Sequence, residues 1–314
     1  MRRSRGTGTA TVRSAPLSAA AALSLLGGLL LTGCGGSGGG DGAPADRPSA
    51  AAPSSRTAPT SPAATPAAEN RPDSLAALGD SVTTGFDACR PLADCPRSSW
   101  VTGTDPGVNS LAKRLLDDPA RRTWNFARAG ARMADLPGQA EAAVAKRPEL
   151  VTVLMGANDA CRTDVSRMTP VDTFRADFST ALRTLRRELP GTRVYVASIP
   201  DLRRLWSLGH DDPRIARVWR LGICPSMLGG TELGEAATQA RRQAVHDRVV
   251  AYNGVLKEVC GTDRRCRYDG GAVFRQRFRL GELSPWDWFH PSRKGQARLA
   301  ETAYGRIVTQ DRPG

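Results

Sequence analysis

The chain has 314 residues, and 44 lysines and arginines against 31 acidic residues give it a formal net charge of +13. These basic residues are spread along the chain rather than gathered in blocks. Such a charge fits either nucleic-acid binding or a general attraction to anionic surfaces or substrates.

An export signal is predicted over residues 1–33. Four arginines precede an apolar run over 17–31, and a basic head followed by a short apolar core is typical of a secretory signal. The run ends in Leu31-Thr32-Gly33-Cys34, which resembles the bacterial lipobox. The resemblance implies that Cys34 is lipidated and anchors an exported lipoprotein to the outer face of the membrane; a non-lipidated signal is the alternative. An exported protein meets little nucleic acid, so we expect none as a partner.

Residues 34–72 are predicted to form a disordered tether. From residue 35 to 72 the chain is almost entirely Gly, Ser, Ala, Pro and Thr, with no Leu, Ile, Val or aromatic residue. Such a composition offers too little apolar surface to offset the entropy of ordering. The remaining residues, 73–314, are enough for one sizeable domain with a single core.

The cysteines agree with export. Besides Cys34 there are six, and an even number in an exported domain predicts three disulfides, for which fifteen connectivities exist. Two pairs lie six residues apart around turn-forming residues, and they leave a third pair. The expected disulfides are Cys89–Cys95, Cys260–Cys266 and Cys161–Cys224. Metal binding is the rival explanation, but no Cys-x-x-Cys pair or histidine cluster supports it, so we expect no metal.

Short apolar runs predict five strands, which cover 75–78, 123–127, 150–155, 193–199 and 266–268. Apolar residues at three- and four-residue spacing predict the helices between them, over 108–115, 136–143, 169–189, 245–259 and 292–308. Strand and helix alternate along the chain, which predicts an α/β fold with a parallel sheet covered by helices on both faces.

Prolines mark the expected starts of two helices. Thr169-Pro170 is typical of a helix start, with a capping residue followed by proline at the first helical position. Pro291 is expected to start the last helix. Residues 200–232 are predicted to be irregular, and so long an excursion in a compact domain is usually a binding loop or lid.

Small or polar residues follow the predicted strand ends. They are Ser81, Gly130 and Asn158, together with Asp287 and His290 before the last helix. Open α/β sheets bind their ligands at the carboxyl ends of the strands, so we expect these residues to lie along one edge of the sheet.

The sequence around these residues resembles the SGNH (GDSL-type) hydrolases in four blocks. The blocks are Gly79-Asp80-Ser81, Asn125-Phe126-Ala127-Arg128-Ala129-Gly130-Ala131, Gly156-Ala157-Asn158-Asp159 and Asp287-Trp288-Phe289-His290-Pro291. All four are present in order and span nearly the whole predicted domain. The resemblance implies a serine esterase or lipase, without a cofactor, of three-layer α/β/α architecture with about five parallel strands.

The resemblance and the needs of acyl transfer together imply a role for each residue. Ser81 is the expected nucleophile, His290 the base, and Asp287 the residue that holds the imidazole tautomer. The expected oxyanion donors are the backbone N–H groups of Ser81 and Gly130 and the side-chain amide of Asn158. Glycine at position 130 is expected because it lets the backbone approach closely.

Other polar and aromatic residues have structural explanations. Asp80 and Asp159 are expected to orient turns, and His210 and His246 to be structural. The tryptophans on either side of Asp287, Trp286 and Trp288, either line an acyl pocket or only contribute to packing.

The expected partner is an ester substrate, either a lipid or an acylated carbohydrate, and the protein is expected to be a monomer. A carbohydrate O-acetyl esterase is the alternative to a lipid esterase, since the SGNH hydrolases include both. A non-catalytic envelope lipoprotein that binds a ligand with the same fold is the alternative from another class. Loss of any of the four blocks would favour it, and none is lost.

Overall fold

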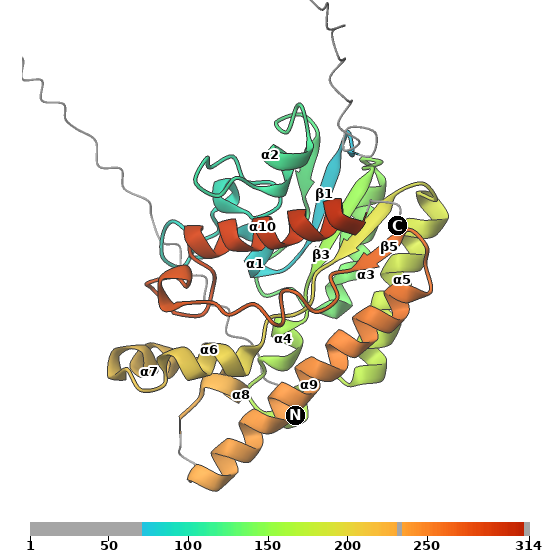
Figure 1. Ribbon diagram of the computed structural model, residues 1–314. Helices are drawn as coiled ribbons and strands as arrows, with labels where there is room; N and C mark the ends of the chain where they lie inside the picture. Colours follow the sequence, from blue (N-terminus) through green and yellow to red (C-terminus); the bar gives the residue numbers. More distant parts are fainter. Residues whose placement is uncertain (1–70, 231–233, 311–314) are drawn as a thin grey trace, which may run out of the picture. The chain divides into compact units, whose positions relative to one another are not determined.

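The computed structural model describes residues 71–230 and 234–310 (Figure 1). The predicted signal peptide, Cys34 and nearly all of the predicted tether lie outside these residues. Among the helices within the two ranges, none is both long and apolar enough to cross a membrane.

Within the described residues, five parallel strands form one sheet in the order β2-β1-β3-β4-β5. The strands are β1 (Leu75–Gly79), β2 (Thr123–Asn125), β3 (Leu150–Leu154), β4 (Arg193–Val196) and β5 (Cys266–Tyr268). Leu75 of β1 lies opposite Thr123 on one side and Leu150 on the other. Strands β1 and β3 are wholly buried, which explains why each reads as a continuous apolar run. The expected α/β fold with a five-stranded parallel sheet is confirmed.

Helices cover both faces of this sheet (Figure 1). In the described residues the α-helices are α1 (Ser81–Thr84), α2 (Leu111–Leu115), α3 (Leu136–Val144), α4 (Ala157–Ala160), α5 (Val171–Glu188), α6 (Leu202–Gly209), α7 (Pro213–Trp219), α8 (Pro225–Leu228), α9 (Glu235–Gly261) and α10 (Arg293–Gln310). Helices α3, α5 and α9 pack side by side on one face, and α2 and α10 contact each other on the other face. This is the expected three-layer arrangement.

Three strands end earlier than predicted, at Asn125, Leu154 and Val196. Beyond β4, the backbone N–H and C=O of Ile199 bond to the side chain of Asn253 on α9, at 2.8 and 3.1 Å. The apolar run continues past the strand because Ile199 is still buried, although its backbone partner is a side chain.

Two helices begin later than predicted. Helix α2 begins at Leu111. Helix α5 begins at Val171, with Pro170 as its N-cap residue. The hydroxyl of Thr169 donates to Asp159 Oδ1 at 2.7 Å, so it does not cap the helix.

The prediction that residues 200–232 are irregular is wrong for the described part of that segment, which contains α6, α7 and α8. Asp201 accepts hydrogen bonds from backbone N–H groups at the start of α6. Asp212 does the same for α7, where Pro213 is the first helical residue. Both are helix-start signals. Leu202, Leu205 and Trp206 also lie at three- and four-residue spacing, so signals for α6 were present in the sequence.

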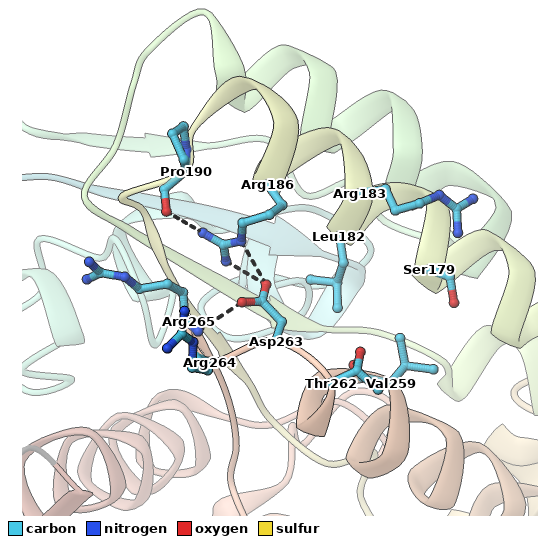
Figure 2. A pocket seen from close by; sticks show the side chains of 10 residues that line it. All are labelled: Ser179, Leu182, Arg183, Arg186, Pro190, Val259, Thr262, Asp263, Arg264 and Arg265. Carbon is cyan, nitrogen blue, oxygen red and sulfur yellow. Dashed lines mark hydrogen bonds and ion pairs between the residues drawn. The ribbon is translucent and has the colours of Figure 1, made fainter.

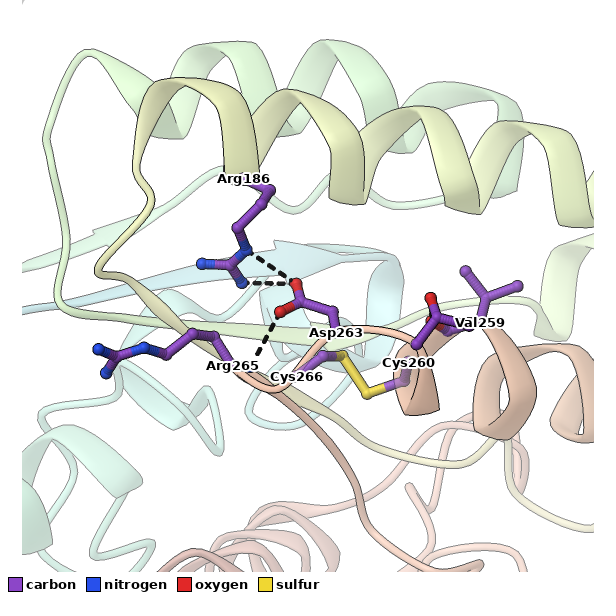
Figure 3. The surroundings of a disulfide bond; sticks show 7 residues. Arg186, Val259, Cys260, Asp263, Arg265 and Cys266 are labelled. Atoms are coloured by element: carbon purple, nitrogen blue, oxygen red, sulfur yellow. Dashed lines mark hydrogen bonds and ion pairs between the residues drawn. A yellow bond between two sulfur atoms is a disulfide. The ribbon is translucent and has the colours of Figure 1, made fainter.

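The disulfides among the described residues are those expected from the sequence: Cys89–Cys95, Cys161–Cys224 and Cys260–Cys266. The second joins the end of α4 to the start of α8. The third joins the end of α9 to β5 (Figure 3). Beside it, Arg186 on α5 donates hydrogen bonds of 2.9 and 2.6 Å to Asp263 Oδ2, which ties α5 to the same turn.

Candidate active site

Ser81 lies where β1 ends and α1 begins. The carboxylate of Asp80 caps α1 by accepting a hydrogen bond of 3.0 Å from the Val82 N–H. Gly79 is required before it, because a Cβ at that position would lie 2.6 Å from the carbonyl oxygen of Leu154 on β3. The chain thus runs close against its neighbouring strand and turns at once into the helix, which places Ser81 at the carboxyl edge of the sheet.

His290 and Asp287 reach Ser81 from a loop that lies about 200 residues later in the sequence. Ser81 Oγ is 2.9 Å from His290 Nε2, and His290 Nδ1 is 2.5 Å from Asp287 Oδ2. Ser81 and Asp287 are buried, and His290 is partly buried. An ionised carboxylate can only accept hydrogen bonds, so Nδ1 carries the hydrogen and the lone pair on Nε2 faces the serine hydroxyl. The three side chains are therefore arranged for proton transfer from Ser81.

Asp287 is held in its ionised form by hydrogen-bond donors. Its Oδ1 accepts from the backbone N–H groups of Phe289 and His290, at 2.9 and 3.0 Å. Burial opposes the charge, but the His290 side chain and these two N–H groups outweigh it and lower the pKa of Asp287. The carboxylate is thus available to stabilise a positively charged imidazole.

The loop over 284–290 is closed by its own backbone. The Ser284 N–H donates to the carbonyl of His290 at 2.8 Å, and Leu283 and Pro291 form an isolated antiparallel bridge. This closure brings the side chains of Asp287 and His290, which lie three residues apart, together. Pro291 belongs to the bridge and does not start α10, contrary to the sequence expectation.

The predicted oxyanion donors lie on neighbouring strand ends. A backbone hydrogen bond of 3.2 Å from Arg128 to the end of β1 brings the turn that contains Gly130 next to the serine turn. Asn158 lies on α4, just after β3, and its amide donates to the Ala131 carbonyl at 3.0 Å. The amide has a second hydrogen. Among the described residues, neither the Ser81 nor the Gly130 backbone N–H has a hydrogen-bond acceptor.

Gly130 is needed for its backbone conformation. Its φ is +77°, in a region that residues with a Cβ rarely adopt. A Cβ at this position would meet no atom within 4 Å. Whether glycine here also lets the backbone approach a substrate closely stays a prediction.

Asp80 and Asp159 bond to the turns around them, as expected. Asp159 accepts hydrogen bonds from the Met133 N–H at 2.9 Å and from the Thr169 hydroxyl at 2.7 Å. Burial raises the pKa of Asp159 to about 6 and that of Asp80 to about 7. Both carboxyl groups therefore keep their protons to higher pH than ordinary aspartates.

The other two histidines have partners of their own, which fits a structural role. His246 Nδ1 lies 3.3 Å from Asp201 Oδ1, and the His210 ring stacks on Trp206 with 4.1 Å between centroids. Trp286 is exposed and Trp288 is partly buried. Whether either tryptophan lines an acyl pocket stays a prediction.

Residues from two segments without a predicted helix or strand also contact this site, and the sequence did not point to them. Trp219 on α7 donates its indole N–H to the backbone carbonyl of Asp287 at 3.0 Å. The Phe86 ring lies 4.9 Å from the His290 ring, between centroids. Asp87 lies close to both Asp287 and His290. Single aromatic or acidic residues in such segments carry no periodic signal that could have identified them.

One group of side chains in the described ranges has the composition of a metal site. Asp87, Asp287 and His290 offer oxygen and nitrogen atoms within 4.8 Å of one another. Both nitrogens of His290 are already hydrogen-bonded, one to Asp287 and the other to Ser81. A cation would have to displace one of these bonds, so the arrangement favours a proton-transfer chain over a metal centre.

A cavity of about 980 Å³ lies between α5 and α9, and none of its lining residues belongs to this site (Figure 2). Its lining includes Arg183, Arg186, Arg264 and Arg265. Figure 2 shows the guanidinium groups of Arg183 and Arg265 pointing apart, and Arg186 is bound to Asp263. These basic groups do not converge on a common point.

Residues 75–303 match the family described as GDSL-like Lipase/Acylhydrolase, whereas no curated protein sequence matches the chain. Solved structures are similar at low identity. For a catalytic mutant of Axe2, an acetylxylan esterase from Geobacillus stearothermophilus, the identity is 15%, the TM-score is 0.48, and 75% of this chain and 94% of that chain are covered. For the lipase Lip_vut3 from a goat rumen metagenome, the identity is 15%, the TM-score is 0.48, and 74% of this chain and 96% of that chain are covered. For the psychrotrophic esterase EstA from Pseudoalteromonas sp., the identity is 12%, the TM-score is 0.40, and 76% of this chain and 98% of that chain are covered.

Proposed function

The chain belongs to the GDSL-like lipase/acylhydrolase family, and from this premise we propose that it hydrolyses carboxylic esters with Ser81 as the nucleophile. The observation that carries the proposal is the hydrogen-bonded series Ser81–His290–Asp287, with 2.9 Å between the serine oxygen and the imidazole nitrogen. A serine hydroxyl is a weak nucleophile and needs an adjacent base. His290, oriented by Asp287, supplies that base.

Acylation of Ser81 is the first half of the reaction. His290 Nε2 takes the hydroxyl proton while Ser81 Oγ forms a bond to the carbonyl carbon of the ester. Asp287 stabilises the resulting imidazolium because it accepts the Nδ1–H. The imidazolium then gives its proton to the leaving alcohol, and the acyl group stays on Ser81.

Deacylation repeats these steps with water in place of the alcohol. His290 takes a proton from water as the water oxygen attacks the acyl carbon. It returns the proton to Ser81 Oγ as the bond between Oγ and the acyl carbon breaks and the carboxylic acid leaves. In both halves, the backbone N–H groups of Ser81 and Gly130 and the amide of Asn158 stabilise the negative carbonyl oxygen. These donors are carried by neighbouring strand ends, so little rearrangement is needed during the reaction.

A panel of esters tests the proposal. Wild-type protein, Ser81→Ala and His290→Ala are assayed on p-nitrophenyl esters of increasing chain length, acetylated xylan and phospholipid. We expect hydrolysis by the wild type, a loss of about 10⁴-fold or more in both variants, and labelling of Ser81 by a fluorophosphonate in the wild type. A folded wild-type protein that hydrolyses none of these esters and takes no label would contradict the proposal and favour a ligand-binding protein.

The same panel separates the two kinds of esterase. A rate that rises with acyl-chain length and extends to phospholipid identifies a lipid esterase. Release of acetate from xylan, with little activity on longer acyl chains, identifies a carbohydrate O-acetyl esterase.

Export and lipid anchoring through Cys34 are part of the proposal. They are supported by the lipobox in the sequence and by the disulfides of the described residues, because disulfides persist in oxidising compartments. The tether over 34–72 would give the enzyme reach from the membrane surface.

A further inference from the structure

Asp87 is a buried carboxyl group beside the catalytic loop. It follows α1 and is 1% exposed. Its Oδ1 accepts a hydrogen bond from the Leu92 N–H, and its own N–H donates to the Ala93 carbonyl at 3.0 Å. The loop thus folds back onto Asp87, and the Cys89–Cys95 disulfide closes the same region. Asp87 has a φ of +57°, which aspartate adopts more readily than most residues.

The carboxyl group of Asp87 lies close to that of Asp287. Asp87 and Asp287 each offer an oxygen, and His290 a nitrogen, within 4.8 Å of one another. Both aspartates are buried. Two carboxylates this close in a buried site cannot both ionise at low cost, so the pair binds its first proton more tightly than two separate aspartates would.

The hydrogen-bond donors decide which partner keeps the proton. Asp287 accepts from the His290 imidazole and from two backbone N–H groups, whereas Asp87 accepts from the Leu92 N–H. A proton bound by the pair is therefore favoured on Asp87 over Asp287. The pKa directions agree: burial and the neighbouring Asp287 raise the pKa of Asp87, while the donors around Asp287 overcome its burial and lower its pKa.

We propose that Asp87 is a positioning residue of the catalytic chain, whose protonated carboxyl donates a hydrogen bond to Asp287 and holds it against His290. The chain is then Asp87–Asp287–His290–Ser81. Asp87 keeps its proton throughout the reaction, so the proton balance of acyl transfer is unchanged. The inference rests on the proposed function, because it gives Asp87 a part in the same proton-transfer series.

Other titratable groups near the chain bear on its pH dependence. Asp287 raises and His290 lowers the pKa of Asp87, and His290 also lowers the pKa of Asp80. Asp80 is the same in every variant below, so differences between variants report on Asp87. Loss of the Asp87 donor concentrates negative charge on Asp287, which favours the protonated imidazole. The acid limb of the kcat/KM profile should then move to higher pH.

Asp87→Gly removes the donor without adding strain, because glycine adopts a φ of +57° readily. Asp87→Asn is the conservative variant, since its amide can donate to Asp287 while its oxygen accepts from the Leu92 N–H. Asp94→Gly is the matched control. Asp94 lies in the same loop, is exposed, and accepts from the Thr84 hydroxyl rather than facing Asp287.

The variants are compared by the pH dependence of kcat/KM and by the downfield proton NMR resonance of the His290–Asp287 hydrogen bond. Asp87→Gly should lower kcat about tenfold with KM within about twofold, and move the acid limb up by about half a pH unit. It should also shift the resonance. Asp87→Asn should restore kcat to within about threefold of wild type. It should also return the acid limb of the kcat/KM profile and the proton resonance to their wild-type positions. Asp94→Gly should change neither the limb nor the resonance.

Three results would overturn the inference. A folded Asp87→Gly variant with the wild-type acid limb and resonance would show that Asp87 only closes its loop. An Asp87→Asn variant as impaired as Asp87→Gly would show that an ionised carboxylate is needed, and inactivation of the wild type by EDTA with recovery on Ca²⁺ or Zn²⁺ would identify a cation as its partner. The resonance requires no substrate, so this test is valid even where the ester panel fails.

Discussion

The indole of Trp219 donates a hydrogen bond of 3.0 Å to the backbone carbonyl of Asp287, and so fastens α7 to the loop that carries Asp287 and His290. Trp219 is 2% exposed. A buried carbonyl that loses its donor is left unsatisfied, so this bond matters both for the stability of the fold and for the position of Asp287.

Trp219→Phe should keep most of the packed apolar surface and remove the indole N–H. We expect a loss of about 1–2 kcal/mol in the free energy of unfolding. We also expect a fall of about tenfold in kcat, because the base is less well oriented. Urea unfolding and kinetics on one short-chain ester measure both. Trp206→Phe, on the neighbouring α6, is the control and should leave kcat unchanged. A Trp219→Phe enzyme with wild-type kcat would limit the bond to a structural role.

Asn158→Ala tests the side-chain oxyanion donor. The amide should bond the developing negative oxygen more strongly than the ground-state carbonyl, so kcat should fall about 10²–10³-fold with little change in KM. The variant also loses the hydrogen bond to the Ala131 carbonyl, which should reduce stability by about 1 kcal/mol. Tm and kcat are measured on the same preparation. A destabilised variant with nearly wild-type kcat would make Asn158 a turn residue only.

Asp80→Asn should stabilise the protein in a pH-dependent way. Burial raises the pKa of Asp80 from 3.8 to about 7 in the folded state, so between these values the folded protein holds a proton that the unfolded chain has lost. The contribution of Asp80 to stability is therefore complete below the lower value and is lost as pH rises to the upper one. Asparagine does not ionise and avoids this loss.

The free energy of unfolding by urea, measured at a series of pH values, checks this prediction. The advantage of Asp80→Asn over wild type should grow from about pH 4 to about pH 7 and then level off. The exposed Asp94→Asn variant should show no such trend. A stability difference that is equal at every pH would contradict a buried, protonated Asp80.

Removal of the Cys161–Cys224 disulfide should destabilise the protein more than removal of Cys260–Cys266. The sequence separations are 63 and 6 residues. The loop-entropy relation gives about 4 kcal/mol for the first and about 2 for the second. The double serine variants are compared by urea unfolding. The first should also lower kcat, because its disulfide begins at the end of α4, which carries Asn158. Equal losses of stability in the two variants would argue against the entropic account.

Cys34→Ser should move the protein out of the lipid-modified membrane fraction. Without the cysteine, the signal is either left uncleaved or the protein is released without a lipid. Cell fractionation combined with metabolic labelling by a fatty acid measures this, with Cys89→Ser as a control for the loss of a cysteine outside the lipobox. Unchanged labelling of Cys34→Ser would show that the lipobox interpretation is wrong.

The sequence by itself determined the parallel α/β architecture, because its signals are local. The run at 75–78 followed by Gly79-Asp80-Ser81 shows a buried strand that turns at once. The Asp-x-x-His spacing places Asp287 and His290 in one short loop. Hydrophobic periodicity and short spacings depend on residues that are neighbours in the chain, so they can be read without the fold.

Only the tertiary structure decided the strand order and the contacts around the base. Trp219 and Asp87 meet the loop over 284–290 from segments that lie 68 and 200 residues away from Asp287. The φ of Gly130 and the short capped helices α6 and α7 were also revealed only by the structure. Such contacts join residues whose closeness depends on how the strands are ordered and the helices packed, and no local pattern encodes a pairing across that distance.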